Sequence, residues 1–394
     1  MKIKLNDNYL NIKESYLFSD INKKVKAFTQ ANPNADIIRL GIGDVTLPLA
    51  PCVVEAMKKA CDELGVKETF RGYPPEYGYD FLKQAVADYY KRNANVEIKL
   101  NEVFISDGAK SDVGNIPDIF GDNEIIIPDP VYPVYMDSNL MNGRKIRLIK
   151  GSRENGFLPM PNDLTGEGMI IYICSPNNPT GAVYDRKQLK TWVDFAIKTG
   201  SLIIFDSAYE KFVTGDLPKS IFEIDGAREC AIEICSLSKT AGFTGTRCAW
   251  TIIPEQATVC ERSLNKMWAR RQATKFNGLS YPVQRGAEMA LSVEGMKECE
   301  KNIEYYKENA RIIADLMREK NIEFTGGVCS PYIWLKCPNN MKSWEFFDFL
   351  LEKANIVGTP GSGFGEAGEG YFRLTAFGDR ERTKQAVERM RKIL

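Results

Sequence analysis

The sequence contains no histidine among its 394 residues. Catalytic triads and metal sites that depend on an imidazole are therefore excluded. Ten cysteines are present, but they are scattered from Cys52 to Cys337 without a Cys-X-X-Cys pair or metal-like spacing. We expect no bound metal, and we expect most of the cysteines to be small buried side chains of a reduced protein.

Long apolar runs and net charge are also missing. No run approaches the roughly 20 apolar residues that cross a bilayer, and residues 1–7 lack the apolar core of a signal peptide. Lysine plus arginine equals aspartate plus glutamate, at 52 each, so no overall field attracts nucleic acid or an anionic membrane. These absences predict a soluble, cytoplasmic protein whose partners are small molecules, with neither nucleic acid nor membrane among them.

Apolar runs of strand length alternate with helical patterns through the middle of the chain. The strand-like runs are residues 103–105, 125–127, 169–174, 202–205 and 231–235. Apolar residues at helical spacing occupy residues 81–90 and 189–196. This alternation predicts an α/β fold with a mainly parallel, doubly wound sheet.

The length exceeds the size at which one hydrophobic core usually stops growing, so we expect two domains. Residues 1–45 carry helix signals and a short strand, and we assign them to an N-terminal arm and part of the smaller domain. Residues 46–285 are assigned to the larger domain. From residue 286 long amphipathic helices precede further strands, so residues 286–394 are assigned to a smaller α+β domain.

One lysine stands among hydroxyls and small residues. Residues 236–247 are Ser-Leu-Ser-Lys-Thr-Ala-Gly-Phe-Thr-Gly-Thr-Arg, which places Arg247 eight positions after Lys239. A lysine that forms a Schiff base with an aldehyde cofactor needs such a setting, because hydroxyls, amides and a guanidinium hold a phosphate beside it. The run predicts a pyridoxal phosphate site in the larger domain, with Lys239 as the catalytic residue.

The other groups that this cofactor needs follow the predicted strands. They are Tyr132 after residues 125–127, Asn178 after 169–174, Asp206 with Tyr209 after 202–205, and Ser236 to Lys239 after 231–235. Ligands of a parallel α/β sheet collect at the carboxyl ends of its strands, so these clusters are expected to converge on one crevice.

Each side chain has a chemical role to fill. Asp206 would pair with a protonated ring nitrogen, and Asn178 would donate its amide to the phenolic oxygen of the ring. Tyr132 would stack on the ring, while the loop with Ala109 and Lys110 opens a helix whose amides suit a phosphate. Considered singly, Asp206 could instead cap a helix and Tyr132 could be an ordinary wall residue.

Arg373 lies within an apolar run, where a charge is costly unless it is paired. A bidentate clamp on the α-carboxylate of a substrate would supply that partner. A buried ion pair with a carboxylate of the protein is the alternative.

Three motifs together resemble a known superfamily. They are Asn-Asn-Pro-Thr-Gly at residues 177–181, Asp206 followed by Tyr209, and Ser-X-Ser-Lys at residues 236–239 with Arg247. These motifs resemble the fold-type I pyridoxal phosphate aminotransferases. The resemblance implies a large domain with a mainly parallel doubly wound sheet and a smaller α+β domain.

Longer stretches resemble the LL-diaminopimelate aminotransferase family within that superfamily. They are residues 14–18, 39–46, 69–73, 107–112, 129–135 and 239–247. The resemblance implies interconversion of tetrahydrodipicolinate plus L-glutamate with LL-2,6-diaminopimelate plus 2-oxoglutarate, in the biosynthesis of lysine and peptidoglycan precursors.

The resemblance also implies a set of site residues. Those expected to touch the substrate are Tyr16, Gly43, Glu76, Lys110, Tyr132, Asn178, Asn277 and Arg373. Those expected to hold the cofactor are Tyr73, Ala109, Lys110, Tyr132, Asn178, Asp206, Tyr209, Ser236, Ser238, Lys239, Arg247 and Asn277. The family is homodimeric, and Tyr16, Tyr73, Glu76 and Asn277 would come from the second subunit.

The sequence departs from the family pattern at two places. Glu14 stands where the family tends to have glycine, and residues 73–78 differ from the usual motif around Glu76. Two alternatives therefore stay open: another class I aminotransferase acting on aspartate, alanine or aromatic amino acids, or a carbon–sulfur β-lyase of the same fold. A cofactor-bearing regulator is disfavoured, because no N-terminal helix-turn-helix pattern or basic patch is present.

Overall fold

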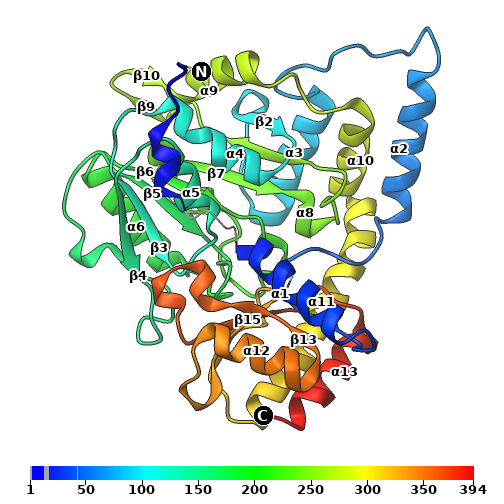
Figure 1. The fold of residues 1–394 in the computed structure, drawn as a ribbon. Coiled ribbons are helices and arrows are strands. Elements are labelled where there is room, and N and C mark those ends of the chain that lie inside the picture. Colours follow the sequence, from blue (N-terminus) through cyan, green and yellow to red (C-terminus); the bar gives the residue numbers. More distant parts are fainter. Residues whose placement is uncertain (1, 13–16, 42) are drawn as a thin grey trace.

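The computed structural model describes residues 2–12, 17–41 and 43–394 (Figure 1). A seven-stranded sheet and its helices form the upper part of the view, and a four-stranded sheet with its helices forms the lower part. Within the described ranges, no helix is both long enough and apolar enough to cross a membrane.

The large sheet has the strand order β2-β8-β7-β6-β5-β3-β4. Its strands are β2 (Val103–Ser106), β3 (Ile125–Asp129), β4 (Ile146–Lys150), β5 (Ile170–Cys174), β6 (Leu202–Asp206), β7 (Ala231–Ser236) and β8 (Ala249–Ile252). The neighbours from β7 to β4 are parallel, whereas β8 is antiparallel to both β7 and β2. All strands except β8 therefore end at one edge, and the predicted mainly parallel α/β sheet is confirmed.

The central strands are buried on both faces because they are unbroken apolar runs. Successive side chains of a strand point to opposite faces, so β5 contributes Ile171 and Ile173 to one core cluster and Ile170 and Tyr172 to another. Each fully buried side chain of this size contributes about 1.5–3 kcal/mol relative to an exposed one. The sheet is therefore a rigid base for the loops at its edge.

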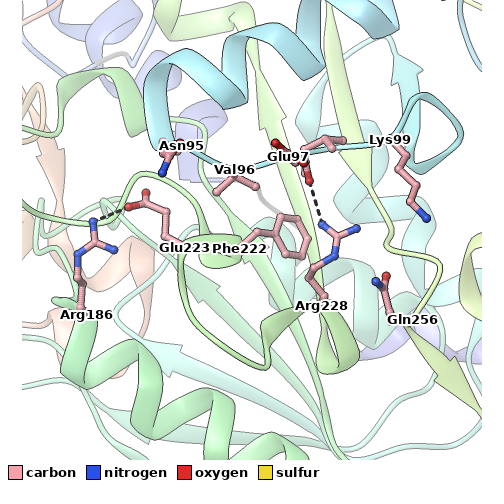
Figure 2. A pocket seen from close by; sticks show the side chains of 11 residues that line it. Asn95, Val96, Glu97, Lys99, Arg186, Phe222, Glu223, Arg228 and Gln256 are labelled. Atoms are coloured by element: carbon pink, nitrogen blue, oxygen red, sulfur yellow. Dashed lines mark hydrogen bonds and ion pairs between the residues drawn. The ribbon is translucent and has the colours of Figure 1, made fainter.

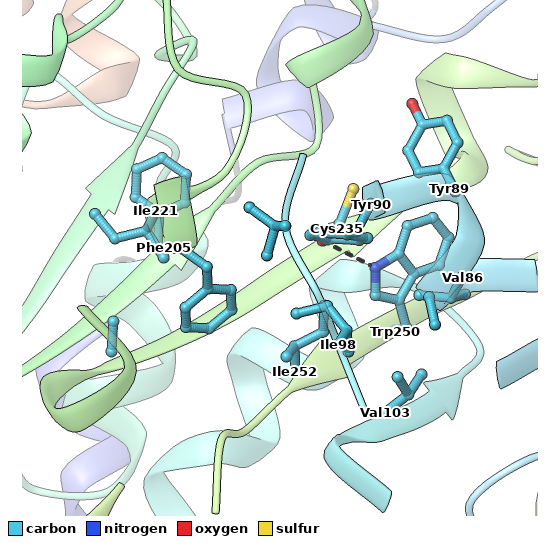
Figure 3. Packing of buried hydrophobic residues seen from close by; sticks show 14 of the residues in the cluster. Val86, Tyr89, Tyr90, Ile98, Val103, Phe205, Ile221, Cys235, Trp250 and Ile252 are labelled. Atoms are coloured by element: carbon cyan, nitrogen blue, oxygen red, sulfur yellow. Dashed lines mark hydrogen bonds between the residues drawn. The ribbon is translucent and has the colours of Figure 1, made fainter. Parts of the chain in front are cut away.

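Figure 3 shows the core cluster that contains Ile171 and Ile173, packed around Trp250, whose indole Nε1 donates to the Tyr90 hydroxyl over 3.1 Å.

The helices around the large sheet are α2 (Pro51–Leu64), α3 (Asp80–Ala94), α4 (Ala109–Asn115), α5 (Val134–Met141), α6 (Arg186–Lys198), α7 (Ala227–Cys230), α8 (Leu237–Thr240), α9 (Leu264–Lys275) and α10 (Tyr281–Leu291). Helix α6 begins with a capping box, because Asp185 Oδ1 accepts from the Gln188 amide and Gln188 Oε1 accepts from the Asp185 amide.

The small sheet is antiparallel, with the order β11-β12-β15-β14. Its strands are β11 (Phe324–Gly326), β12 (Tyr332–Lys336), β14 (Thr359–Pro360) and β15 (Tyr371–Thr375), and the helices nearby are α1 (Leu17–Ala31), α11 (Val293–Glu319), α12 (Ser343–Ala354) and α13 (Arg380–Arg391). Strand β1 (Ile38–Arg39) pairs in parallel with β13 (Ile356–Val357), so part of the N-terminal segment packs with the C-terminal part of the chain. A two-stranded ribbon is formed by β9 (Thr258–Val259) and β10 (Arg262–Ser263).

Short 3-10 helices connect several of these elements. They are η1 (Asp7–Asn11), η2 (Leu100–Glu102), η3 (Ile116–Ile119), η4 (Pro161–Asp163), η5 (Glu210–Phe212), η6 (Ile221–Glu223), η7 (Pro338–Asn340), η8 (Gly361–Phe364) and η9 (Glu366–Gly368). Among them, η5 directly follows the loop after β6 and helps to shape the edge of the large sheet where the strands end.

Candidate active site

A cavity of about 390 Å³ opens where β5, β6 and β7 end, between the large sheet and the small one. Twelve of the predicted site residues line it: Gly43, Ala109, Lys110, Tyr132, Asn178, Asp206, Tyr209, Ser236, Ser238, Lys239, Arg247 and Arg373. Eight further residues line it that carry no predicted role: Phe18, Asp44, Val113, Tyr135, Cys174, Ala208, Thr244 and Tyr332. The clusters at the strand ends thus meet in one place.

Tyr73, Glu76 and Asn277 lie away from this cavity, on the exposed surface of the chain. Their two loops are neighbours, because a Cβ added at Gly278 would come within 2.7 Å of the Pro75 carbonyl oxygen. The remaining predicted residue, Tyr16, lies outside the described residues. A single chain therefore brings together most of the predicted site and leaves these three side chains facing outward.

Lys239 lies on α8, immediately after β7, and its amine donates to the carbonyl oxygen of Gly43. The ring of Phe377 lies 5.3 Å from the amine. The pKa of Lys239 is lowered to about 8, mainly by burial; Asp44 opposes the shift, and the guanidinium groups of Arg373 and Arg247 contribute to it. A lysine with a lowered pKa is more often neutral, and only the neutral amine is a nucleophile.

Asp206 ends β6 and is only 8% exposed. Its Oδ2 accepts from the Tyr135 hydroxyl over 2.6 Å, and its Oδ1 accepts from the Ala208 amide over 3.0 Å. Burial raises the pKa of Asp206, whereas the two hydrogen bonds lower it. A carboxylate held in this way can accept from a cationic N–H in the cavity. Tyr135 was missed by the sequence reasoning, although it lies only three positions after Tyr132 at the start of α5.

Arg373 lies in β15, is 1% exposed, and has its guanidinium between two aromatic rings. Its Cζ is 4.4 Å from the ring centroid of Tyr332 and 4.7 Å from that of Phe364. Its Nη1 donates to Asn178 Oδ1 over 2.7 Å, and its Nη2 donates to the Gly41 carbonyl over 2.7 Å. The bond to Asn178 engages the amide oxygen, so the amide –NH₂ is the group with which Asn178 can donate.

The guanidinium of Arg247 lies so close to Gly108 that a side chain at position 108 would collide with it. A Cβ at Gly108 would lie 1.9 Å from Arg247 Nη2, and the φ of Gly108 is +145°. Arg247 itself has a left-handed φ of 65°, a conformation that costs a non-glycine residue about 1–3 kcal/mol. Such strain is typical of functional sites. Ser236 and Ser238 line the same cavity, and their hydroxyls with the Arg247 guanidinium are donors that suit an anion; we call these three side chains the cradle.

A second hollow of about 700 Å³ lies at the opposite edge of the large sheet, before β7 begins (Figure 2). Its two arginines already have carboxylate partners. Arg186 Nη2 lies 2.6 Å from Glu223 within the hollow (Figure 2), and Arg228 Nη2 lies 2.5 Å from Glu102, a buried residue outside the lining. Because these cations already have carboxylate partners, we assign no chemistry to this hollow.

Comparison with known proteins agrees with the geometry. The family model described as aminotransferase class I and II matches residues 35–390. The chain is 51% identical to the LL-diaminopimelate aminotransferase of Lachnospira eligens, with 99% of this chain and 100% of the relative covered. It is 49% identical to that of Methanosphaera stadtmanae, with both chains covered completely. The solved structure of the L,L-diaminopimelate aminotransferase from Chlamydomonas reinhardtii is similar with a TM-score of 0.94 and 40% identity, and covers 100% of this chain and 99% of that one.

Proposed function

Because the chain belongs to the class I and II aminotransferases, we propose that it interconverts tetrahydrodipicolinate plus L-glutamate with LL-2,6-diaminopimelate plus 2-oxoglutarate. In a cell this reaction would serve the synthesis of lysine and peptidoglycan precursors. The full-length similarity to two relatives named LL-diaminopimelate aminotransferase supports this choice of substrate. The observation that carries the chemistry is the common cavity of Lys239, Asp206 and Arg373.

We propose pyridoxal phosphate as the cofactor, because the donor set of the cavity suits it. Asp206 suits a protonated ring nitrogen, the Asn178 amide suits the phenolic oxygen, and the cradle at Arg247 suits the phosphate. The absent Cβ of Gly108 leaves the room that the cradle needs. When bound, the cofactor supplies an electron sink for the carbanion that remains after the α-proton leaves.

We assign each side chain of this site a separate role in the reaction. Arg373 binds the α-carboxylate through two parallel hydrogen bonds and so orients the Cα–H bond toward Lys239. Lys239 accepts the α-proton as a general base and later returns it as a general acid. Asp206 would pair with a protonated ring nitrogen of the cofactor, and Tyr132 would pack against its ring.

We also propose a homodimer in which Tyr73, Glu76 and Asn277 complete the partner's cavity. All three are exposed in the single chain, and Tyr73 is 87% exposed. The loop that carries Tyr73 and Glu76 follows α2 and projects from the body at the upper right of Figure 1. Glu76 and Asn277 have the chemistry to bind the distal ammonium and carboxylate of diaminopimelate, and Tyr16 would join them.

The division of the chain into residues 1–45, 46–285 and 286–394 is part of the same proposal. Pairing of β1 with β13 supports the assignment of the first segment in part to the smaller domain. We further propose a cytoplasmic location, which ten unpaired thiols support because a reducing compartment keeps cysteines free.

A substrate panel tests the proposed function. The purified, cofactor-loaded protein is incubated with LL-diaminopimelate, its meso isomer, aspartate, alanine or phenylalanine, each with 2-oxoglutarate, and glutamate is measured. We expect the LL isomer to exceed every other donor in kcat/KM by about tenfold or more. Preference for aspartate, alanine or phenylalanine would identify another class I aminotransferase. Pyruvate release from cystathionine without an acceptor would identify a β-lyase.

A further inference from the structure

Tyr332 is a buried tyrosine at the start of β12 that connects two parts of the cavity. It is 1% exposed, and its hydroxyl oxygen lies 2.7 Å from that of Tyr209, which is 7% exposed. Its ring lies 4.4 Å from the guanidinium carbon of Arg373. One side chain therefore contacts both the tyrosine proposed to hold the cofactor and the arginine proposed to hold the substrate.

The position of the Tyr332 hydroxyl is defined on a third side by Gly43. A Cβ at Gly43 would lie 2.7 Å from the Tyr332 oxygen, so a residue with a side chain would displace the hydroxyl. The ring of Tyr332 also packs edge-on against Phe377, whose own ring lies under the Lys239 amine. These contacts leave the hydroxyl directed at Tyr209.

The hydrogen bond between the two phenols can run in either direction, and the proposed function selects one of them. If Tyr209 donates its hydrogen to the phenolic oxygen of the cofactor, it must accept from Tyr332. A hydroxyl that accepts one hydrogen bond donates a stronger one, because linked hydrogen bonds polarise each other. Burial raises the pKa of both hydroxyls, and the charge of Arg373 opposes that rise in each, so it is the bond from Tyr209 to the cofactor that fixes the direction.

We propose that Tyr332 is a positioning residue that donates to the Tyr209 hydroxyl with its oxygen and holds the Arg373 guanidinium with its ring. The inference rests on the proposed function, since the bond from Tyr209 would end on pyridoxal phosphate. Its two parts are separable, because phenylalanine keeps the ring and loses the oxygen, whereas leucine loses both.

The first test is a pH titration of the absorbance bands of the cofactor-loaded enzyme. In Tyr332→Phe the Tyr209 hydroxyl would donate a weaker hydrogen bond to the phenolic oxygen of the cofactor, so that oxygen would be more negative. The protonated carbon–nitrogen linkage between the cofactor and Lys239 would then keep its proton to higher pH. We expect the midpoint to rise by about 0.5–1 pH unit, which corresponds to one hydrogen bond. The substitution leaves in place the other charged or titratable groups that line this cavity: Asp44, Lys110, Tyr132, Tyr135, Cys174, Asp206, Tyr209, Lys239, Arg247 and Arg373.

A double-mutant cycle shows whether the effect passes through Tyr209. Tyr209→Phe is expected to raise the midpoint further than Tyr332→Phe does, and adding Tyr332→Phe to that variant is expected to change nothing. Equal shifts in both backgrounds, or no shift in the wild-type background, would overturn the proposal. The control is Tyr184→Phe, because Tyr184 is equally buried, donates to the Pro159 carbonyl, and lies outside the cavity lining.

The second test is the KM for glutamate. Tyr332→Leu removes the ring beside Arg373 and is expected to raise KM about tenfold, the scale of a desolvated cation–π contact. Tyr332→Phe is expected to keep KM within about twofold of the wild-type value. An unchanged KM in the leucine variant would overturn the part of the proposal that concerns Arg373.

A third measurement is independent of how the variants fold. In a crystal structure of the loaded wild-type protein, we expect the two phenolic oxygens to lie within about 3.0 Å. A separation beyond about 3.5 Å would overturn the proposal. If the wild-type protein never acquires cofactor absorbance, the proposed function fails first, so the two failures are distinguishable.

Discussion

The Tyr135 hydroxyl donates a 2.6 Å hydrogen bond to Oδ2 of Asp206, which is 71 positions further along the chain. Tyr135 lies on α5 and stacks on Tyr172 of β5, with ring centroids 5.2 Å apart. The bond lowers the pKa of Asp206 against the effect of burial. The tyrosine therefore helps to keep a buried carboxylate ionised.

This relationship predicts the order of two losses in turnover. Asp206→Asn removes the charge and is expected to lower kcat on the order of 100-fold, comparable with the loss of one electrostatic catalytic group. Tyr135→Phe is expected to lower kcat by about tenfold or less at neutral pH, because only one supporting hydrogen bond is lost. Asp163→Asn, an exposed carboxylate on η4, is the control and should leave kcat unchanged.

Tyr135→Phe should also change the pH profile. Without the hydroxyl the pKa of Asp206 rises further, so the carboxylate is protonated at a higher pH. The acid limb of the kcat/KM profile is therefore expected to move to higher pH than in the wild type. A limb that does not move, or that moves to lower pH, would show that the bond does not support the charge.

Lys239 should control the pH dependence of cofactor loading. The amine reacts only when it is neutral, and burial lowers its pKa to about 8. The rate at which the apoenzyme takes up pyridoxal phosphate is expected to rise with pH and to level off above a midpoint near that value. A midpoint close to the ordinary lysine value of 10.5 would contradict the effect of burial.

The variant Lys239→Ala should lose both the absorbance of the cofactor linked to this lysine and turnover.

Gly108→Ala should weaken binding of the cofactor without altering the chemistry. The new Cβ would strike Arg247 and would require a positive φ that alanine disfavours. We expect the Kd for pyridoxal phosphate, measured by titrating the apoenzyme, to rise about tenfold or more. Gly114→Ala on α4, the helix that Gly108 precedes, is the matched control, because its added Cβ would meet no atom within 4 Å beyond its chain neighbours and the backbone of its own helix.

Glu233 is expected to stabilise the folded protein more in mild acid than at neutral pH. It is fully buried in β7 and accepts from the hydroxyls of Tyr90, Ser207 and Ser220. Burial raises its pKa from 4.5 to about 7. The folded state thus binds this proton more tightly, so the stabilisation is complete below pH 4.5 and is lost as pH rises through 7.

Glu233→Gln removes that titration and provides the comparison. The free energy of unfolding of the wild type, minus that of Glu233→Gln, is expected to fall by about 3 kcal/mol as pH rises across this window. Denaturant titrations at several pH values measure the difference. A difference that does not vary with pH would show that the carboxyl group is not buried as described.

Glu76→Ala tests recognition of the distal end of the substrate and the shared site. We expect a lower kcat/KM for LL-diaminopimelate with a nearly unchanged glutamate half-reaction. Mixing Glu76→Ala chains with Lys239→Ala chains should restore diaminopimelate turnover above that of either parent, because one cavity of the mixed dimer then has both side chains. No restoration in verified mixed dimers would contradict a site built across the interface.

The elements that could be foreseen were those with a strong local signal. The runs that became β3, β5 and β6 are apolar almost to their ends, and β7 is interrupted only by Glu233, so burial of these strands was expected. Strand β4 is only partly buried and its alternation is weak, and nothing local indicated that β8 would run against its neighbours. Both belong to the sheet through pairing with distant residues.

The sequence by itself determined that this chain has a mainly parallel α/β sheet, and it was the source of our proposal that a reactive lysine lies beside a phosphate cradle. Those features depend on apolar runs and on residues close together along the chain, where spacing alone sets the chemistry. Only the tertiary structure decided that Tyr135 supports Asp206 and that Tyr332 lies between Tyr209 and Arg373. Such contacts join segments many residues apart, and their geometry depends on how the two sheets pack rather than on any local pattern.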